Sequence, residues 1–206
     1  TDQGATGDAF ELLHHTAGLR LKRRKLTVID ATSVQRADRA GLVADMLTRQ
    51  GEILAAAWEA RSPDVPVQSP TELLTLASIV EKETALAEER ARIAGVFTRR
   101  LEKRMRLQTD PTVIYGIGPD FDGNITRKHL RTDTPYNTYT RRGLPPTPIA
   151  NPGRAAIEAA LNPDTTEYIF FVADGTGGHA FATNLDDHNR NVARWREIEA
   201  ERASDG

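Results

Sequence analysis

The hydrophobic positions along this chain recur mostly three and four residues apart, which is the spacing of an amphipathic helix. This period predicts helices over residues 9–22, 37–60, 87–103 and 186–201. Two runs of β-branched and aromatic residues, 26–30 and 168–173, instead predict strands. A Gly-rich turn over 175–178 then makes 180–183 the expected hairpin partner of the second run. The pattern predicts an α+β fold, with a mainly helical front half and a small β-sheet in the C-terminal half.

One further helix is predicted to begin at the sequence Ser-Pro-Thr-Glu, residues 69–72, after a proline-containing linker. Ser69 suits the N-cap, Pro70 suits the first helical position, and Glu72 stands three residues after the cap. At about 100° per residue, the apolar side chains of this helix cluster on one face. The positions on that face are Leu73, Leu76, Ala77, Val80, Thr84 and Ala87.

This helix also contains two glutamates, Glu81 and Glu83, two positions apart. Glu83 lies about 60° from the centre of the apolar face, and Glu81 about 100° away on the other side. A carboxyl at the edge of the core is partly desolvated, which raises its pKa toward the value that a general acid needs. The alternative is that both are ordinary solvated glutamates, as Glu88 and Glu89 would be. The periodicity leaves both interpretations open.

Composition and charge exclude several classes of function. With 27 Lys and Arg against 29 Asp and Glu, the net charge is −2, so no basic field favours nucleic acid. The absence of cysteine removes disulfides and thiolate chemistry. His179 and His188 have no third His or Cys nearby, so no metal is expected. No signal peptide and no apolar run of the ~18 residues that span a membrane is visible.

Four segments, in this order, resemble the catalytic region of the endolytic murein (peptidoglycan) lytic transglycosylases, the MltG/YceG-like family. They are Leu74–Thr84, Arg106–Gly116, Tyr136–Tyr139 and Gly178–Asn184. The resemblance runs from about Leu47 to the C-terminus. It divides the chain into a helix–strand–helix segment of uncertain origin, residues 1–46, and a lytic transglycosylase-like catalytic domain, residues 47–206.

Residues 10–42 have a weaker resemblance of their own, to an internal piece of a P-loop polynucleotide kinase. The phosphate loop of such a kinase, a Gly-rich run ending in Lys followed by Ser or Thr, occurs nowhere in the chain. No nucleotide is therefore expected, and the favoured alternative is a packing element.

The transglycosylase resemblance implies that Glu83 is the catalytic residue and needs no cofactor or metal. In that family a single glutamate protonates the oxygen between N-acetylmuramic acid and N-acetylglucosamine. The same carboxylate then accepts the proton of the muramoyl C6 hydroxyl, which attacks C1 and leaves a 1,6-anhydro end. The alternative is a catalytically silent module that binds glycan or serves as a cell-wall scaffold.

The candidates for substrate binding fall within the same four segments. They are Gln108, Asp110, Tyr136, Asn137, Tyr139, His179 and Asn184. Alternatives remain for four positions: residues 108–110 can support Glu83, Thr109 or Asp110 can cap the next helix, and Asn184 can cap the last. Asp110 as a second catalytic carboxylate is less favoured.

The resemblance also implies where the protein works and what it meets. The expected partners are peptidoglycan glycan strands and, by family resemblance, peptidoglycan synthases. The expected location is the periplasmic face of the bacterial inner membrane, although no anchor or signal is recognised in the sequence.

Overall fold

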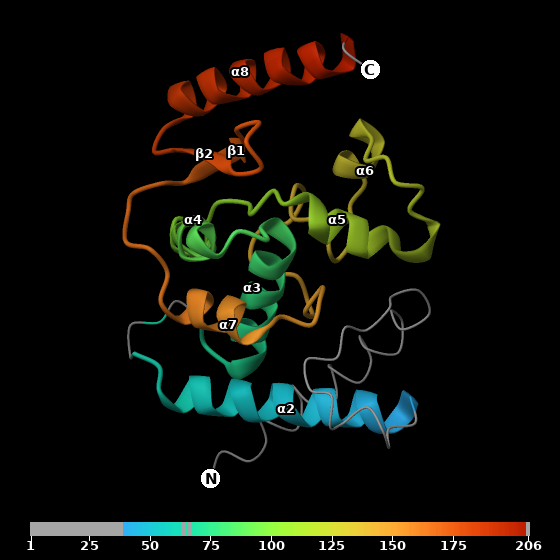
Figure 1. Ribbon diagram of the computed structural model, residues 1–206, viewed down its shortest axis with the longest axis vertical. Coiled ribbons are helices and arrows are strands. Elements are labelled where there is room, and N and C mark those ends of the chain that lie inside the picture. Colours follow the sequence, from blue (N-terminus) through green and yellow to red (C-terminus); the bar gives the residue numbers. More distant parts are fainter. Residues whose placement is uncertain (1–38, 63–64, 66, 205–206) are drawn as a thin grey trace.

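The computed structural model describes residues 39–62, 65 and 67–204. The predicted helix over 9–22, the strand over 26–30 and most of the kinase-like segment lie outside these residues. Helices dominate the described part, and two short strands come late in the chain (Figure 1). In chain order the elements are α2 (Arg39–Glu59), α3 (Pro70–Glu83), η1 (Ala87–Glu89), α4 (Arg90–Glu102), α5 (Asp110–Ile117), η2 (Gly118–Asp120), α6 (Arg127–Arg131), α7 (Arg154–Leu161), β1 (Phe170–Ala173), β2 (His179–Ala182) and α8 (Leu185–Ser204).

Helix α3 forms the centre of the molecule and contacts α2, α4, α5 and α7 (Figure 1). Every residue from Leu73 to Val80 is buried, including the polar Thr75 and Ser78. The prediction of one apolar face was therefore wrong, because neighbouring helices cover this helix on all sides. The two hydroxyls are satisfied locally: Thr75 donates to the Thr71 carbonyl at 2.7 Å and Ser78 to the Thr75 carbonyl at 2.7 Å.

Both ends of α3 are fixed by local contacts. At its start the Ser69 hydroxyl accepts the Glu72 N–H at 3.2 Å, which confirms the predicted cap. At its end Thr84 is extended, with φ of −140°, so the helix stops at Glu83. The prediction that Thr84 and Ala87 continue the helical face was wrong, because the chain leaves the helix before it reaches them.

The predicted hairpin is confirmed, with its second strand displaced by one residue. Strands β1 and β2 pair antiparallel, with Phe170 opposite Ala182 and Ala173 opposite His179. Helix α8 lies across the hairpin, and α4 contacts β1 (Figure 1). Phe171 fixes this layer to the core by an edge-to-face contact with Phe97 of α4, at 5.7 Å between ring centres. The architecture confirms the α+β prediction.

Helix α2 runs without a break across the predicted division at residues 46 and 47. Its buried side chains, Leu47 and Leu54, belong to the same core as α3 and α7. Residues 39–46 and the start of the catalytic segment therefore form one element. No helix in the part of the chain that the structure describes is both long and apolar enough to span a bilayer.

Candidate active site

Glu83 is the last residue of α3, and its carboxyl meets the start of α5. The hydroxyl of Thr109 donates a hydrogen bond to Oε1 of Glu83. Thr109 is itself buried and held in place, since its N–H donates to Oγ1 of Thr138 at 3.1 Å. That hydroxyl also lies 2.9 Å from Oγ1 of Thr112. The buried Thr138 and Thr112 thus hold Thr109, whose hydroxyl contacts the Glu83 carboxyl.

The surroundings of Glu83 raise the pKa of its carboxyl above the usual value. Burial is the largest cause, since desolvation disfavours the charged form, although part of the residue stays exposed. The Thr109 hydrogen bond lowers the pKa, the negative charge of Asp110 raises it, and His179 and Arg100 lower it. The position at the C-terminal end of α3 also disfavours an anion, because the carbonyl groups there carry partial negative charge. On balance these surroundings raise the pKa of the Glu83 carboxyl.

The neighbouring glutamate, Glu81, is turned to another part of the molecule. Its Oε2 accepts the N–H of Gly153 at 3.1 Å, and Gly153 is the N-cap of α7. In the last turn of α3, Glu81 therefore contacts the start of α7, whereas Glu83 contacts the start of α5. Of the two candidates, Glu83 is the one beside Thr109 and Asp110.

Asp110 and Tyr139 meet each other close to Glu83. The Tyr139 hydroxyl donates to Oδ1 of Asp110 at 2.6 Å. Burial, followed by this hydrogen bond, raises the pKa of Tyr139 far above its ordinary value, so it stays a neutral donor. Gln108 lies on the surface with a left-handed φ of 53°, and its N–H donates to the Thr138 carbonyl at 3.2 Å.

Asn137 is buried and its amide is fully used by the backbone. Its Nδ2 lies within hydrogen-bond distance of the carbonyl oxygens of His129, Leu130 and Thr132, at 3.1, 3.2 and 2.7 Å. Its Oδ1 accepts the N–H of Tyr139 at 2.9 Å. The side chain therefore holds the turn that carries Tyr139 against the end of α6.

Tyr136 and Asn184 also have partners within the chain. The Tyr136 hydroxyl lies 2.7 Å from Oγ1 of Thr147, and its ring packs against Tyr115 at 4.9 Å between ring centres. Asn184 precedes α8, and its Oδ1 accepts the N–H of Asp187 at 2.9 Å. The Asn184 side chain therefore caps the start of α8.

His179 opens strand β2 and is bonded to a buried carboxylate. Its Nδ1 lies 2.7 Å from Oε2 of Glu89, and its backbone N–H donates to Oε1 of Glu89 at 2.8 Å. The interpretation of Glu89 as a solvated glutamate was wrong, because the residue is only 6% exposed. Nothing in the local sequence pointed to this pair, since 90 positions separate its members.

Sequence analysis also missed Arg100, a buried cation of α4. Its Nε donates to the Ile169 carbonyl at 2.7 Å, and its Nη1 to the Leu107 carbonyl at 2.7 Å. It thereby joins the segment before β1 to the segment before Thr109, and its charge acts on Glu83. A buried arginine is rare enough to attract attention, but its burial appears only in the folded chain.

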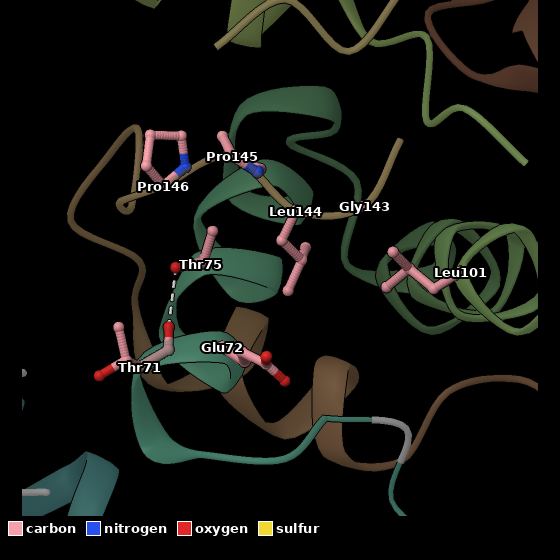
Figure 2. A pocket seen from close by; sticks show the side chains of 8 residues that line it. All are labelled: Thr71, Glu72, Thr75, Leu101, Gly143, Leu144, Pro145 and Pro146. Atoms are coloured by element: carbon pink, nitrogen blue, oxygen red, sulfur yellow. Dashed lines mark hydrogen bonds between the residues drawn. The ribbon is translucent and has the colours of Figure 1, made fainter. Parts of the chain in front are cut away.

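The site around Glu83 is distinct from a hollow of about 370 Å³ at the other end of α3 (Figure 2). That hollow is lined by Thr71, Glu72, Thr75, Leu101, Gly143, Leu144, Pro145 and Pro146. None of the predicted site residues lines it. In the described part of the chain, no group of three or more His, Asp or Glu side chains is arranged to hold a metal ion.

With this geometry in view, comparison with known proteins identifies the family. A family model described as the YceG-like family matches residues 32–194. The chain belongs to the YceG-like family. The match begins before α2 and ends within α8, so it includes Glu83, Thr109, Tyr139 and His179.

Individual YceG-like relatives agree with this assignment. The chain is 48% identical over 123 residues to a Bacillus subtilis protein named endolytic murein transglycosylase, which covers 60% of this chain and 34% of that protein. A Streptococcus pneumoniae protein of the same name is 43% identical over 128 residues, 59% of this chain and 23% of that protein. The chain thus spans about a third of the first relative and less than a quarter of the second.

A solved structure shows the same fold. The crystal structure of a putative YceG-like protein from Listeria monocytogenes superposes with a TM-score of 0.66 at 31% identity. The superposition covers 92% of this chain and 64% of that one. These comparisons do not bear on the kinase-like resemblance of residues 10–42.

Proposed function

We propose that this YceG-like chain cleaves peptidoglycan glycan strands at internal positions by a lytic transglycosylase reaction. The observation that carries the proposal is Glu83: one carboxyl with a raised pKa, held by Thr109 at the junction of α3 and α5. A general acid must be protonated to act, and desolvation raises the pKa of Glu83 in the direction that favours the protonated form. The names of the relatives from B. subtilis and S. pneumoniae support the choice of substrate.

In the proposed reaction Glu83 acts first as an acid and then as a base. Its proton passes to the glycosidic oxygen between N-acetylmuramic acid and N-acetylglucosamine as the bond from that oxygen to C1 breaks. The resulting carboxylate accepts the proton of the muramoyl C6 hydroxyl, whose oxygen bonds to C1. Glu83 is protonated again, the product ends in 1,6-anhydro-muramic acid, and no water is consumed.

An internal nucleophile suits a site with one acid and base. The C6 hydroxyl is already attached to the sugar under attack, and such proximity can lower a barrier by up to ~7–11 kcal/mol. Most glycosidases instead use two carboxylates. Asp110 is the nearby candidate for a second, but its Oδ1 accepts the Tyr139 hydroxyl. Its proposed role is to raise the pKa of Glu83 by charge.

The remaining side chains have proposed roles of two kinds. Gln108, on the surface beside Thr109, and the ring of His179 are proposed to contact the glycan. Tyr139 is proposed to orient Asp110, and Asn137 to hold the Tyr139 turn. Tyr136 and Asn184, with partners of their own, are proposed as scaffold.

Digestion of purified murein in ¹⁸O-labelled water tests the reaction type. We expect 1,6-anhydro-muramoyl ends without label, internal cuts in long strands, and no release by Glu83→Gln, a loss of roughly 10²–10⁴-fold or more. Label at new reducing ends would mean hydrolysis and give Asp110 the second catalytic role. Glycan binding without release of any product would favour the silent binding module.

The place of action is proposed from the family. YceG-like relatives named as murein transglycosylases act on the bacterial cell wall, so we propose contact with peptidoglycan at the periplasmic face of the inner membrane. Peptidoglycan synthases are the proposed protein partners. In-cell crosslinking of the full-length gene product tests both proposals: recovery with murein synthases supports them, and recovery only in the cytoplasm contradicts them.

A further inference from the structure

The carboxylate–imidazole pair of Glu89 and His179 lies beside the proposed acid, and the reaction as described gives Glu89 no role. Glu89, at the end of η1, is buried, and both of its carboxylate oxygens are bonded to His179. Oε2 also lies 3.4 Å from the Thr84 hydroxyl, directly after Glu83. The His179 ring lies near enough to the Glu83 carboxyl for a positive charge on the ring to lower the pKa of that carboxyl.

The two oxygens of Glu89 have different partners, and together these partners fix the state of the imidazole ring. Oε1 accepts the backbone N–H of His179, which can only donate. Oε2 faces Nδ1 of the ring, and a carboxylate accepts but does not donate, so Nδ1 must carry its proton. In the neutral ring Nε2 is then an unprotonated acceptor. A carboxylate behind an imidazole fixes ring tautomer and orientation in this way in many sites.

The packing around the pair also keeps the carboxylate in place. A Cβ atom at Gly178 would lie 2.9 Å from Oε1 of Glu89 and 3.4 Å from Cδ1 of Leu86, so a larger residue there would displace the carboxylate. On its other side the ring of His179 meets Phe171 edge-to-face at 5.2 Å between ring centres. The imidazole is thus contacted by an aromatic ring and by a carboxylate.

We infer that Glu89 is a positioning residue that presents Nε2 of His179 as a hydrogen-bond acceptor for the attacking C6 hydroxyl of the sugar bound at Glu83. Nε2 aligns the hydroxyl oxygen with C1 but does not take its proton, which passes to the Glu83 carboxylate. This inference rests on the proposed function. It adds to that function a second contact for the nucleophile, because Glu83 alone must otherwise both receive the proton and orient the hydroxyl.

Glu89→Gln is the decisive variant, because Gln has the same shape but only one acceptor oxygen. That oxygen is needed by the His179 backbone N–H, so the NH2 group then faces Nδ1 and donates to it. Nδ1 becomes the acceptor and Nε2 carries the proton. We expect ¹⁵N NMR of the labelled histidines to show protonated Nδ1 at His179 in the parent and protonated Nε2 in Glu89→Gln. His179→Phe identifies the signal.

The matched activity measurement uses release of anhydro-muropeptides. We expect Glu89→Gln and His179→Phe each to lower kcat by roughly 10–100-fold with little change in KM, as for a misaligned reacting group. The kcat of the double variant, Glu89→Gln with His179→Phe, should be no lower than that of His179→Phe alone. The control is Asp174→Asn. Asp174 also lies near His179, but it is bonded to Thr176, whose N–H and hydroxyl both donate to Oδ1 of Asp174. The Asp174→Asn variant should keep the parent tautomer of His179 and the parent rate of anhydro-muropeptide release.

The outcomes separate this inference from the proposed function. If Glu83→Gln is inactive while Glu89→Gln and His179→Phe release product at the parent rate, the inference is wrong and the proposed function stands. An unchanged His179 tautomer in Glu89→Gln also overturns it. If Glu83→Gln keeps its activity, the proposed function itself fails. A folded Glu89→Gln with a changed tautomer and a reduced kcat supports the inference over a merely structural role.

Discussion

The hydroxyl of Thr109 donates a hydrogen bond to the carboxyl of Glu83, across 26 positions of sequence and from the N-cap position of another helix. This bond opposes the effect of burial, because it stabilises the charged form of Glu83 while desolvation disfavours it. The pKa of the proposed acid is therefore adjustable in both directions by changing its neighbours.

Thr109→Val should raise the pKa of Glu83 further. Valine keeps the branched shape but removes the hydroxyl that lowers this pKa. Since the acid must be protonated to act, the alkaline limb of the kcat/KM profile for anhydro-muropeptide release should move to higher pH. Thr109→Ser keeps the donor and is the control. A profile with the same alkaline limb in Thr109→Val would show that this bond does not set the acidity of Glu83.

Asp110→Asn should move the same limb in the opposite direction. Removing the negative charge of Asp110 removes a cause that raises the pKa of Glu83, and Asn can still accept the Tyr139 hydroxyl. The alkaline limb should shift to lower pH. At pH values below that limb, the rate of product release should stay within about tenfold of the parent rate. Complete loss of activity at every pH would instead assign Asp110 a direct part in the chemistry.

Glu83→Gln should stabilise the folded protein at alkaline pH. The folded-state pKa of Glu83 is raised above its ordinary value of 4.5, so the protonated form is favoured in the folded state. Its contribution is fully present below pH 4.5 and is lost as the pH rises through the raised pKa. The variant should have the higher melting temperature at pH 8, and the difference should vanish near pH 4. Equal melting temperatures at both pH values would contradict this.

Asn137→Ala should reduce stability and act on catalysis only through the fold. The change leaves carbonyl groups of the α6 segment and the Tyr139 N–H without their side-chain partner. Each lost hydrogen bond costs about 0.5–1.5 kcal/mol in the free energy of unfolding. Chemical denaturation measures the cost, and Asn184→Ala, which removes only an exposed cap, should cost about 0.5–2 kcal/mol. A raised KM with unchanged stability would show that Asn137 contacts the glycan.

Local features of this fold could be predicted because their cause is local. The start of α3 follows from Ser69 and Pro70, and the hairpin follows from two short apolar runs around a Gly-rich turn. The burial of Thr75 and Ser78 could not be predicted, since it depends on how α2, α4, α5 and α7 pack around α3. Periodicity describes one helix, whereas burial depends on its neighbours.

The site was predictable to the extent that the family resemblance identified its segments. Thr109 was among the residues expected to support Glu83, but Glu89 and Arg100 were not anticipated. Their partners are distant in sequence: His179 lies 90 positions after Glu89, and Ile169 lies 69 positions after Arg100. Only packing brings such pairs together, so a single sequence contains no local trace of them.

The placement of Thr109 has a consequence for attempts to engineer this protein. The residue occupies the N-cap position of α5, yet its hydroxyl makes no bond to that helix, because it faces Glu83. The helix thus forgoes a stabilisation worth about 1 kcal/mol. A search for thermostable variants would favour Asp here, which caps a helix well but has no hydrogen to donate to Glu83. Position 109 is where stability and activity demand different residues, so heat resistance gained there should come with lost turnover.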